Sequence, residues 1–229
     1  MPTDRHLRRH IRRHIEPHEV TALGRTMKAE VRTSMMRTRT MMPAEQRAAA
    51  SRAIVDRVIG LKAWADARSV ALFRSIVRKA EVDTGALDAA ARAAGKRVAY
   101  PVIEGDLAAD DRGSPEVPIE DASMGFRWVD DLASLASRGR GFPEPPREAP
   151  PVETLDLVIV PGLAFDPAGY RVGYGAGLYD RALPRFPGAT TVGIAFDFQL
   201  AMELPRGEHD VPVGVVVTEK RVIVTGETS

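Results

Sequence analysis

Five short runs of apolar, mostly β-branched residues constrain the fold of this chain more than any other feature. Helix-like stretches separate several of these runs, which cover Ser69–Phe73, Arg97–Tyr100, Leu157–Val160, Thr191–Phe196 and Val213–Thr218. Most of them are apolar at consecutive positions, as strands are when helices cover both faces of their sheet. The alternation of strands and helices therefore predicts an α/β fold with a largely parallel sheet, Rossmann-like in its layering.

The expected helices precede and separate these runs. A basic helical pattern extends from Met27 to about Thr40, a second helix is expected from Pro43 to about Gly60, and a third covers about Thr84–Ala94. Their apolar residues recur at three- and four-residue spacing, which indicates one buried face.

A long segment interrupts this regular pattern. Residues 104–151 are rich in proline, glycine and acidic side chains, apart from the stretch Met124–Trp128 and a short helix expected over Val129–Ala136. Long loops inside compact domains commonly form functional rims or lids. We therefore expect partial order here, at the edge of a pocket.

The composition excludes several classes of protein. The chain has 229 residues, of which 44% are hydrophobic and 28% charged, values that are typical of a globular domain. It contains no cysteine, so disulfides, thiolate nucleophiles and cysteine-ligated metals are excluded. No apolar run is long enough to span a membrane. We expect no membrane partner and a cytoplasmic location.

Basic charge is concentrated at the N-terminus. Residues 1–40 contain ten Lys and Arg against four Asp and Glu, net +6, whereas the remaining 22 basic and 27 acidic residues give −5. We expect a basic N-terminal extension over residues 1–26 and one α/β domain over residues 27–229. Any contact with nucleic acid is then confined to residues 1–26.

Four histidines are spaced by four residues within this extension, namely His6, His10, His14 and His18. On a helix they could bind a transition metal, and the arginines between them could lie on RNA or anionic lipid. The same pattern fits a solvated, partly frayed helix, or an upstream stretch added by a misplaced start codon. Pro17 and Gly24 are expected to interrupt the helix before the domain begins.

A glycine-rich segment carries the strongest chemical signal. Gly173, Gly175 and Gly177 alternate, so the backbone can turn tightly and bring its N–H groups close to a ligand such as phosphate. A helix beginning near Gly177 would add its positive end. Arg171 would supply a cation, and Asp180 in the first helical turn could hold a magnesium ion. A glycine-rich turn between strand and helix explains the same residues without a ligand.

The run PGLAFDPAGYRVGYGAGLYDRAL, which contains these glycines, resembles the signature of the 5-formyltetrahydrofolate cyclo-ligase family, also called 5,10-methenyltetrahydrofolate synthetases. The resemblance covers about residues 27–220. Further similar motifs follow the family's order: Met27–Arg32, Glu81–Thr84, Gly141–Pro145, Asp197–Gln199, Glu208–Pro212 and Thr218–Glu219.

The resemblance implies a three-layer fold related to sugar-phosphate isomerases and coenzyme A transferases. It also implies ATP- and Mg²⁺-dependent cyclisation of 5-formyltetrahydrofolate to 5,10-methenyltetrahydrofolate, with release of ADP and phosphate. A formamide oxygen is a poor leaving group, so a phosphorylated formyl intermediate is expected, from which phosphate departs. Two alternatives stay open: a catalytically weak folate-binding or RNA-associated protein of the same fold, and an isomerase of a related fold that needs no ATP.

The resemblance further implies roles for individual residues. Arg171 and Asp180 are the catalytic candidates, and Asp180 and Asp210 are the magnesium ligands. The ATP-binding candidates are Lys28, Arg32, Arg171, Val172, Gly173, Tyr174, Gly175, Ala176, Gly177, Leu178 and Tyr179. The candidates for contact with reduced folate are Ile76, Glu81, Tyr174, Gly175, Ala176, Gly177 and Leu178.

Two positions in the glycine-rich segment depart from common members of the family. Ala176 replaces a lysine found in some of them, and Leu178 replaces a common aromatic residue, which removes one cation and one stacking contact. Other aromatic residues could line a pterin pocket instead, or belong to the core: Phe126, Trp128 and Phe142.

Overall fold

The computed structural model describes residues 17–104, 122–137 and 142–226, which form a seven-stranded mixed sheet with the strand order β11-β10-β9-β6-β1-β2-β3. The inner strands run parallel, and each edge strand is antiparallel to its neighbour. The parallel strands are β1 (Ser69–Ala71), β2 (Arg97–Glu104), β6 (Leu157–Pro161), β9 (Thr190–Ile194) and β10 (Val215–Val217), and the edges are β3 (Ser123–Trp128) and β11 (Val222–Val224).

The five inner strands coincide with the five apolar runs, so the predicted parallel sheet is confirmed. Consecutive residues enter two different cores because side chains alternate across a strand. Leu157 and Ile159 belong to one hydrophobic cluster, while Val158 and Val160 belong to the other. All four are fully buried, which explains why these strands are apolar at every position.

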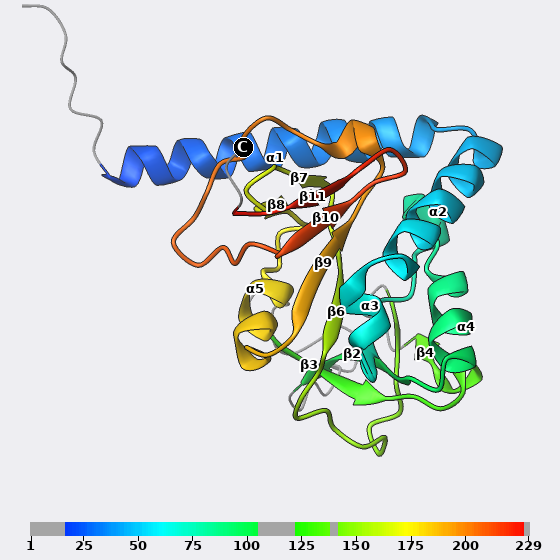
Figure 1. Cartoon of the computed structure of the whole chain (residues 1–229). Coiled ribbons are helices and arrows are strands. Elements are labelled where there is room, and N and C mark those ends of the chain that lie inside the picture. The colour runs from blue at the N-terminus through cyan, green and yellow to red at the C-terminus, as the bar shows by residue number, and fades with distance from the viewer. Residues whose placement is uncertain (1–16, 105–121, 138–141, 227–229) are drawn as a thin grey trace, which may run out of the picture.

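Helices cover both faces of the sheet, as Figure 1 shows, and the predicted three-layer arrangement is confirmed. One face carries α2 (Ala44–Ile59), α3 (Lys62–Asp66) and α4 (Gly85–Ala93), and the other carries α5 (Leu178–Ala182). The shorter elements are η1 (Val77–Lys79), η2 (Leu132–Ser134), η3 (Leu183–Arg185), η4 (Asp197–Gln199), β4 (Ala136–Ser137), β5 (Pro143–Glu144), β7 (Ala164–Phe165) and β8 (Arg171–Val172).

The longest helix, α1 (Pro17–Met41), lies across one end of the sheet and contacts η1, β7 and β8 (Figure 1). The expected interruption at Gly24 is wrong. The one expected at Pro17 stays a prediction, because residues 1–16 lie outside the described part of the chain. Pro17 is the first helical residue, where the missing N–H would have no partner in any case. The helix continues through Gly24, and Val31 and Met35 anchor it by packing against a small cluster near β7 and β8.

The long central connection is more regular than its composition suggested. Met124–Trp128 lies within β3, which pairs with β2 along six residues. The helix expected over Val129–Ala136 is wrong, because only Leu132–Ser134 forms a single 3₁₀ turn, after which β4 pairs with β5. The Asp131 carboxylate accepts a hydrogen bond from the Ala133 N–H and so fixes the start of this turn. His6, His10, His14 and the acidic stretch after Glu104 lie outside the described residues.

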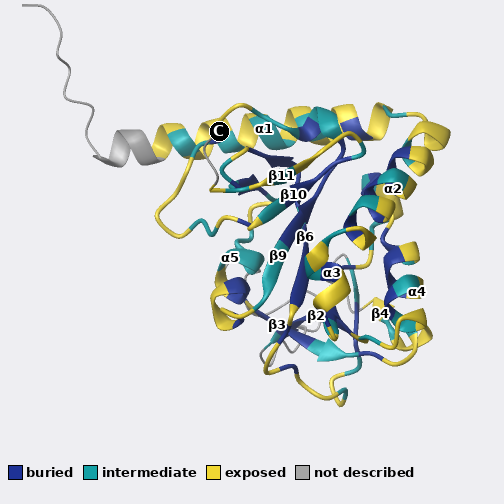
Figure 2. Ribbon diagram, in the orientation of Figure 1, coloured by how far each residue is buried: buried dark blue, intermediate teal, exposed yellow. Residues whose placement is uncertain are grey.

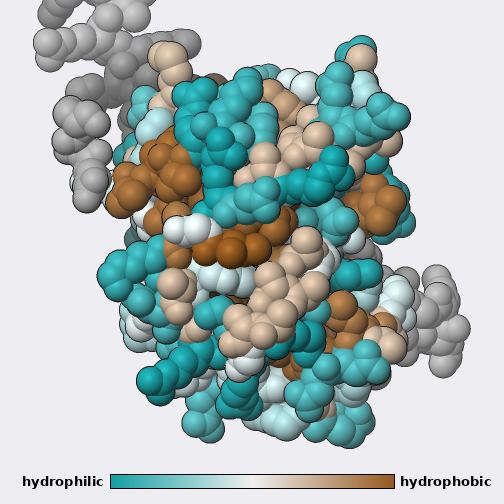
Figure 3. All heavy atoms as spheres, turned by 45° about the vertical axis from the view of Figure 1, so that its right-hand side comes forward, coloured by the Kyte–Doolittle hydropathy of each residue, from teal (hydrophilic) through white to brown (hydrophobic). Residues whose placement is uncertain are grey.

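Burial follows the layers of the fold. Figure 2 shows the inner strands buried, and the helices buried on the side that faces the sheet. On the face shown in Figure 3, hydrophilic side chains cover most of the surface and hydrophobic ones gather in limited patches. Within the described ranges, no helix is both long and apolar enough to cross a membrane.

A chain that begins at Met27 is expected to fold like the full-length protein. In the described part of the chain, every residue of the three hydrophobic clusters lies after Met27. The melting temperature should therefore change by no more than about 3 °C, which corresponds to about 1 kcal/mol for a domain of this size. Thermal unfolding followed by circular dichroism tests this expectation, and loss of a cooperative transition would contradict it.

Candidate functional site

A cavity of about 360 Å³ lies where α1, η1 and the loop between β8 and α5 meet. Every residue that the resemblance implied for binding ATP, folate or metal lines this cavity. They come from segments far apart in sequence, at residues 28–32, 76–81, 171–180 and 210. The fold therefore brings all the candidates to one place, although their individual roles stay proposals.

A tight hairpin places Arg171 at the cavity. The buried carboxylate of Asp166 accepts hydrogen bonds from the N–H groups of Tyr170 and Leu204, at 2.9 and 3.2 Å, and thus closes the turn between β7 and β8. Gly169 has φ +87°, and a Cβ there would lie 2.3 Å from the Val213 carbonyl oxygen. The Asp-Pro-Ala-Gly sequence suits this turn, because proline favours its first part and glycine permits the positive φ at its end.

The glycine loop after β8 needs glycine at two of its three positions. Gly175 has φ +109° and Gly177 has φ +62°, values that side-chain-bearing residues rarely adopt. Gly173 has no such φ, and a Cβ there would meet nothing within 4 Å. Helix α5 begins at Leu178, as predicted, with Gly177 as its N-cap and Asp180 in its first turn.

Two cations of α1 point into the cavity rather than into solvent. Lys28 forms an ion pair with Asp210, and the Arg32 Nε donates a hydrogen bond to the Gly173 carbonyl oxygen at 2.9 Å. The Arg32 guanidinium also lies beside Gly175. Since Lys28 and Arg32 are one helical turn apart, α1 presents both to the glycine loop.

Arg171 is the most buried cation of the site, with 8% of its surface exposed. Its Nη2 donates to Asp180 Oδ1 at 2.8 Å, and its Nη1 donates to the Val211 carbonyl oxygen at 2.5 Å. Burial lowers the pKa of Arg171, while the charges of Asp180 and Asp210 oppose that shift. Arginine side chains in proteins are effectively always protonated, so Arg171 brings a buried positive charge to the cavity.

Asp180 and Asp210 could together hold a magnesium ion. Both carboxylates line the cavity, and both act on the pKa of Arg171, so they face the same cation. Mg²⁺ commonly uses one or two carboxylates and completes its shell with water and phosphate oxygens. In the described segments no group of three or more His, Cys, Asp or Glu is suited to a metal. Two carboxylates therefore fit magnesium held jointly with phosphates, rather than a metal enclosed by protein ligands.

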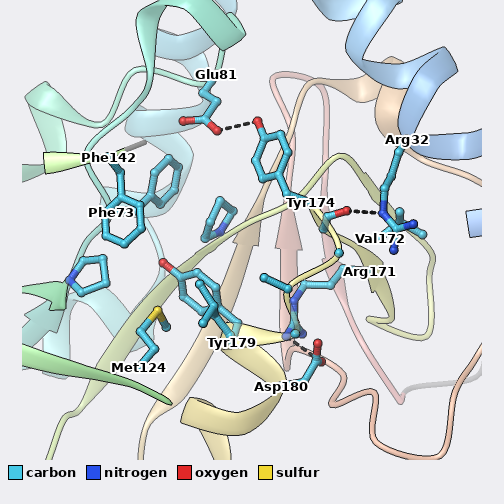
Figure 4. A pocket seen from close by; sticks show the side chains of 18 of the residues that line it. Arg32, Phe73, Glu81, Met124, Phe142, Arg171, Val172, Tyr174, Tyr179 and Asp180 are labelled. Carbon is cyan, nitrogen blue, oxygen red and sulfur yellow. Dashed lines mark hydrogen bonds and ion pairs between the residues drawn. The ribbon is translucent and has the colours of Figure 1, made fainter. Parts of the chain in front are cut away.

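The opposite end of the cavity is aromatic and apolar. Figure 4 shows Phe73, Phe142 and Met124 gathered on one side, away from Arg32 and Arg171, with Tyr179 between them and Arg171. Burial raises the pKa of the Tyr179 hydroxyl, which therefore stays protonated at neutral pH. This end suits a flat, uncharged ring system.

Glu81 is the acidic group of this apolar end and is only 8% exposed. Its Oε1 accepts a hydrogen bond from the Tyr174 hydroxyl and its Oε2 accepts one from the Ile76 N–H, both at 2.7 Å. Lys79 lies 3.7 Å from the centre of the Tyr174 ring, and burial lowers the Lys79 pKa while Glu81 opposes this shift. Val77–Lys79 form the turn η1, and Ala80, which follows this turn and precedes Glu81, has φ 50°.

Of the three aromatic candidates, only Phe142 lines the cavity. Phe126 is 2% exposed and packs edge-on against Phe186, with ring centroids 5.5 Å apart. Trp128 stacks under the Arg97 guanidinium at 3.7 Å. The placement of Phe126 and Trp128 at a pterin pocket is therefore wrong, because β3 directs them into the core and toward its own edge.

Sequence reasoning missed several residues of the site. The cavity is also lined by Arg25, Phe73, Arg74 and Lys79, and Arg39 contacts it from behind. One signal could have found the residues of α1. The basic residues at positions 25, 28, 32 and 39 are separated by three, four and seven residues. These spacings place them on one face of a helix, where they form a single stripe.

Comparison with known proteins identifies the family. Residues 25–219 match the model of the 5-formyltetrahydrofolate cyclo-ligase family. The chain is 34% identical over 161 residues to the 5-formyltetrahydrofolate cyclo-ligase of Escherichia coli strain K12, covering 68% of this chain and 80% of that protein. It is 31% identical over 202 residues to the Mycolicibacterium smegmatis enzyme of the same name, covering 86% and 96%.

Solved structures agree with this match. The NMR structure of Aquifex aeolicus 5,10-methenyltetrahydrofolate synthetase superposes with a TM-score of 0.72 at 32% identity, covering 89% of this chain and 95% of that one. A synthetase of the same name from Mycoplasma pneumoniae shares the fold, with a TM-score of 0.63 at 19% identity. Fold and site thus define an α/β enzyme of the ligase class. The chain belongs to the 5-formyltetrahydrofolate cyclo-ligase family.

The two left-handed glycines allow a paired test of the loop. Gly175→Ala should lower the free energy of unfolding by about 1 kcal/mol or more, because alanine is strained at a positive φ. Gly173→Ala is the matched control and should leave stability nearly unchanged, since its Cβ has open space. Denaturant unfolding measures both variants, and equal stabilities would contradict the strain at position 175.

Proposed function

We propose that the protein catalyses the ATP- and Mg²⁺-dependent cyclisation of 5-formyltetrahydrofolate to 5,10-methenyltetrahydrofolate, with release of ADP and phosphate. Membership of the family supports the cyclo-ligase activity. One observation in the structure carries the rest of the proposal. A single cavity has an aromatic end and a cationic end, and the loop from Tyr174 to Tyr179 lies between them.

The aromatic end would hold the pterin ring of the folate. Phe73 and Phe142 would contact its flat faces, and the Glu81 carboxylate would accept hydrogen bonds from its N–H groups. A carboxylate has about four acceptor positions, of which the hydrogen bonds from Tyr174 and Ile76 occupy two. The Glu81 side chain therefore keeps acceptor capacity for the ring, and burial strengthens such hydrogen bonds.

The cationic end would hold the phosphates of ATP. Among the described residues that line the cavity there are six Lys and Arg but only three carboxylates, so its net charge suits a polyanion. Lys28, Arg32 and Arg171 surround the glycine loop from two sides, and the loop's N–H groups can approach the same oxygens. Asp180 and Asp210 would hold Mg²⁺, which when bound supplies positive charge to the transferred phosphoryl group.

With the two ligands bound in this way, the formyl oxygen of the folate would lie next to the terminal phosphate of ATP. Transfer of the phosphoryl group to that oxygen breaks the bond to ADP and turns the oxygen into part of a good leaving group. The neighbouring arylamine nitrogen then attacks the formyl carbon, loses its proton, and phosphate departs. The protein's contribution is mainly positioning and neutralisation of charge, which dominate phosphoryl transfer.

A direct assay tests the proposal. Purified protein is incubated with 5-formyltetrahydrofolate, ATP and Mg²⁺, and the methenyl product and ADP are measured together. We expect equal amounts of both, and no product when ATP is omitted or excess EDTA is present. Folate that is bound and protected without consumption of ATP would instead identify a binding protein, and product formed without ATP would contradict the ligase mechanism.

The role of Asp180 can be separated from its structural contacts. Its Oδ1 accepts hydrogen bonds from Arg171 and from the Val211 N–H, and asparagine can keep both through its carbonyl oxygen. Asp180→Asn should therefore retain the wild-type melting temperature but lower kcat by about a hundredfold or more and raise the Mg²⁺ concentration needed. Glu203→Gln, which changes an exposed carboxylate, is the control and should match wild type. Wild-type turnover of Asp180→Asn would exclude Asp180 as a metal ligand.

A further inference from the structure

Arg39 is a buried charge that the proposed chemistry does not use. It lies near the end of α1, is only 3% exposed, and does not line the cavity. Its Nε donates to the Lys79 carbonyl oxygen at 2.7 Å, and its Nη2 donates to the Tyr174 hydroxyl at 2.5 Å. Neither acceptor is charged. Burying a guanidinium costs free energy, and hydrogen bonds to two neutral acceptors offset that cost only in part. A buried Arg39 therefore suggests a role beyond stabilising the fold.

The Tyr174 hydroxyl connects this cation to the folate end of the cavity. It accepts a hydrogen bond from Arg39 and donates its own proton to Glu81, whose other oxygen accepts from the Ile76 N–H. Figure 4 shows Tyr174 pointing from the glycine loop toward Glu81. A continuous chain of hydrogen bonds thus runs from α1 through the glycine loop to Glu81, and such chains strengthen their members.

Arg39 also fixes the turn that presents Glu81. The carbonyl that it contacts belongs to Lys79, and Ala80, between Lys79 and Glu81, has the unusual φ of 50°. The Lys79 ammonium in turn covers the Tyr174 ring. One guanidinium therefore holds both the turn that ends in Glu81 and the tyrosine next to Gly175.

We propose that Arg39 is a positioning residue that couples the binding of reduced folate to the binding of ATP, an inference that rests on the proposed function. Folate that bonds to Glu81 orders the carboxylate on which Tyr174 depends, and Tyr174 orders the adjacent glycine loop. The loop is then set to receive phosphates. By thermodynamic linkage, ATP bound at the loop favours folate by the same factor.

A purely structural role for Arg39 makes a different prediction. If Arg39 only stabilises α1, its loss lowers the melting temperature but leaves the effect of folate on the affinity for ATP as it is in wild type. The coupling factor therefore distinguishes the two roles. It is the ratio of the Kd of a non-hydrolysable ATP analogue measured without folate to that measured with saturating 5-formyltetrahydrofolate.

The experiment compares wild type with Arg39→Met, Arg39→Lys, Tyr174→Phe and the Arg39→Met/Tyr174→Phe double variant. We expect a factor of about fivefold or more in wild type and a factor near one in Arg39→Met and Tyr174→Phe. The KM values for both substrates should rise about tenfold in these variants, with a smaller change in kcat. The double variant should be no worse than the single ones, because both break the same chain.

Two variants sharpen the comparison. Arg39→Lys keeps the charge but loses the two-point fork, so it should restore only part of the coupling. Arg37→Met removes an exposed arginine from the same turn of α1 and should behave as wild type. Tyr174→Phe keeps the ring and the Arg39–Lys79 contact and removes only the hydroxyl that links Arg39 to Glu81. It therefore tests the hydrogen-bond chain even if Arg39→Met fails to fold.

Two results would overturn the inference. One is a coupling factor near one in a wild-type protein that forms the methenyl product. The other is a coupling factor that stays at the wild-type value in Tyr174→Phe or in a folded Arg39→Met variant. Failure of the proposed function is a different result. In that case the wild-type protein forms no methenyl product with ATP, even if folate and the ATP analogue each raise the affinity for the other.

Discussion

The site depends on the docking of one basic helix across the ends of the parallel strands. Lys28, Arg32 and Arg39 lie on one face of α1. Their partners come from three segments, which contain Asp210, the adjacent residues Gly173 and Tyr174, and Lys79. None of these segments belongs to a strand of the central sheet. Their relative positions are therefore set by the helix as much as by the sheet, and apolar contacts of Val31 and Met35 fix the helix itself.

The sheet provides the fixed frame against which these loops are held. Phe165 is fully buried between two glycines, and a Cβ at Gly162 or Gly193 would lie 2.4 Å from its ring. The buried Gln199 donates to the carbonyl oxygens of Gly162 and Leu163 and accepts from the Phe196 N–H. Close packing and satisfied polar groups at the ends of β6 and β9 leave the following loop little freedom.

Much of the fold could be predicted from sequence, because strands covered on both faces must be apolar at every position. The edge strand β11 had no such signal, since Val222 and Val224 are exposed and the run is three residues long. The continuity of α1 was missed for a different reason. Gly24 lowers helix propensity only at its own position, whereas packing farther along α1 stabilises the whole helix. Arg39 was missed for another reason. The sequence does not show whether a single arginine is buried or exposed, and only the helix face that Arg39 shares with Lys28 indicates that it points toward the domain.

The charges of the cavity compensate one another within the protein. Lys28 pairs with Asp210, and Arg171 pairs with Asp180, so the two carboxylates proposed for Mg²⁺ are the partners of two cations proposed for phosphate. A nucleotide bound with magnesium would bring a cation for the carboxylates and anions for Lys28 and Arg171. The exchange would replace ion pairs with ion pairs and leave no charge uncompensated, which keeps the desolvation penalty of binding low.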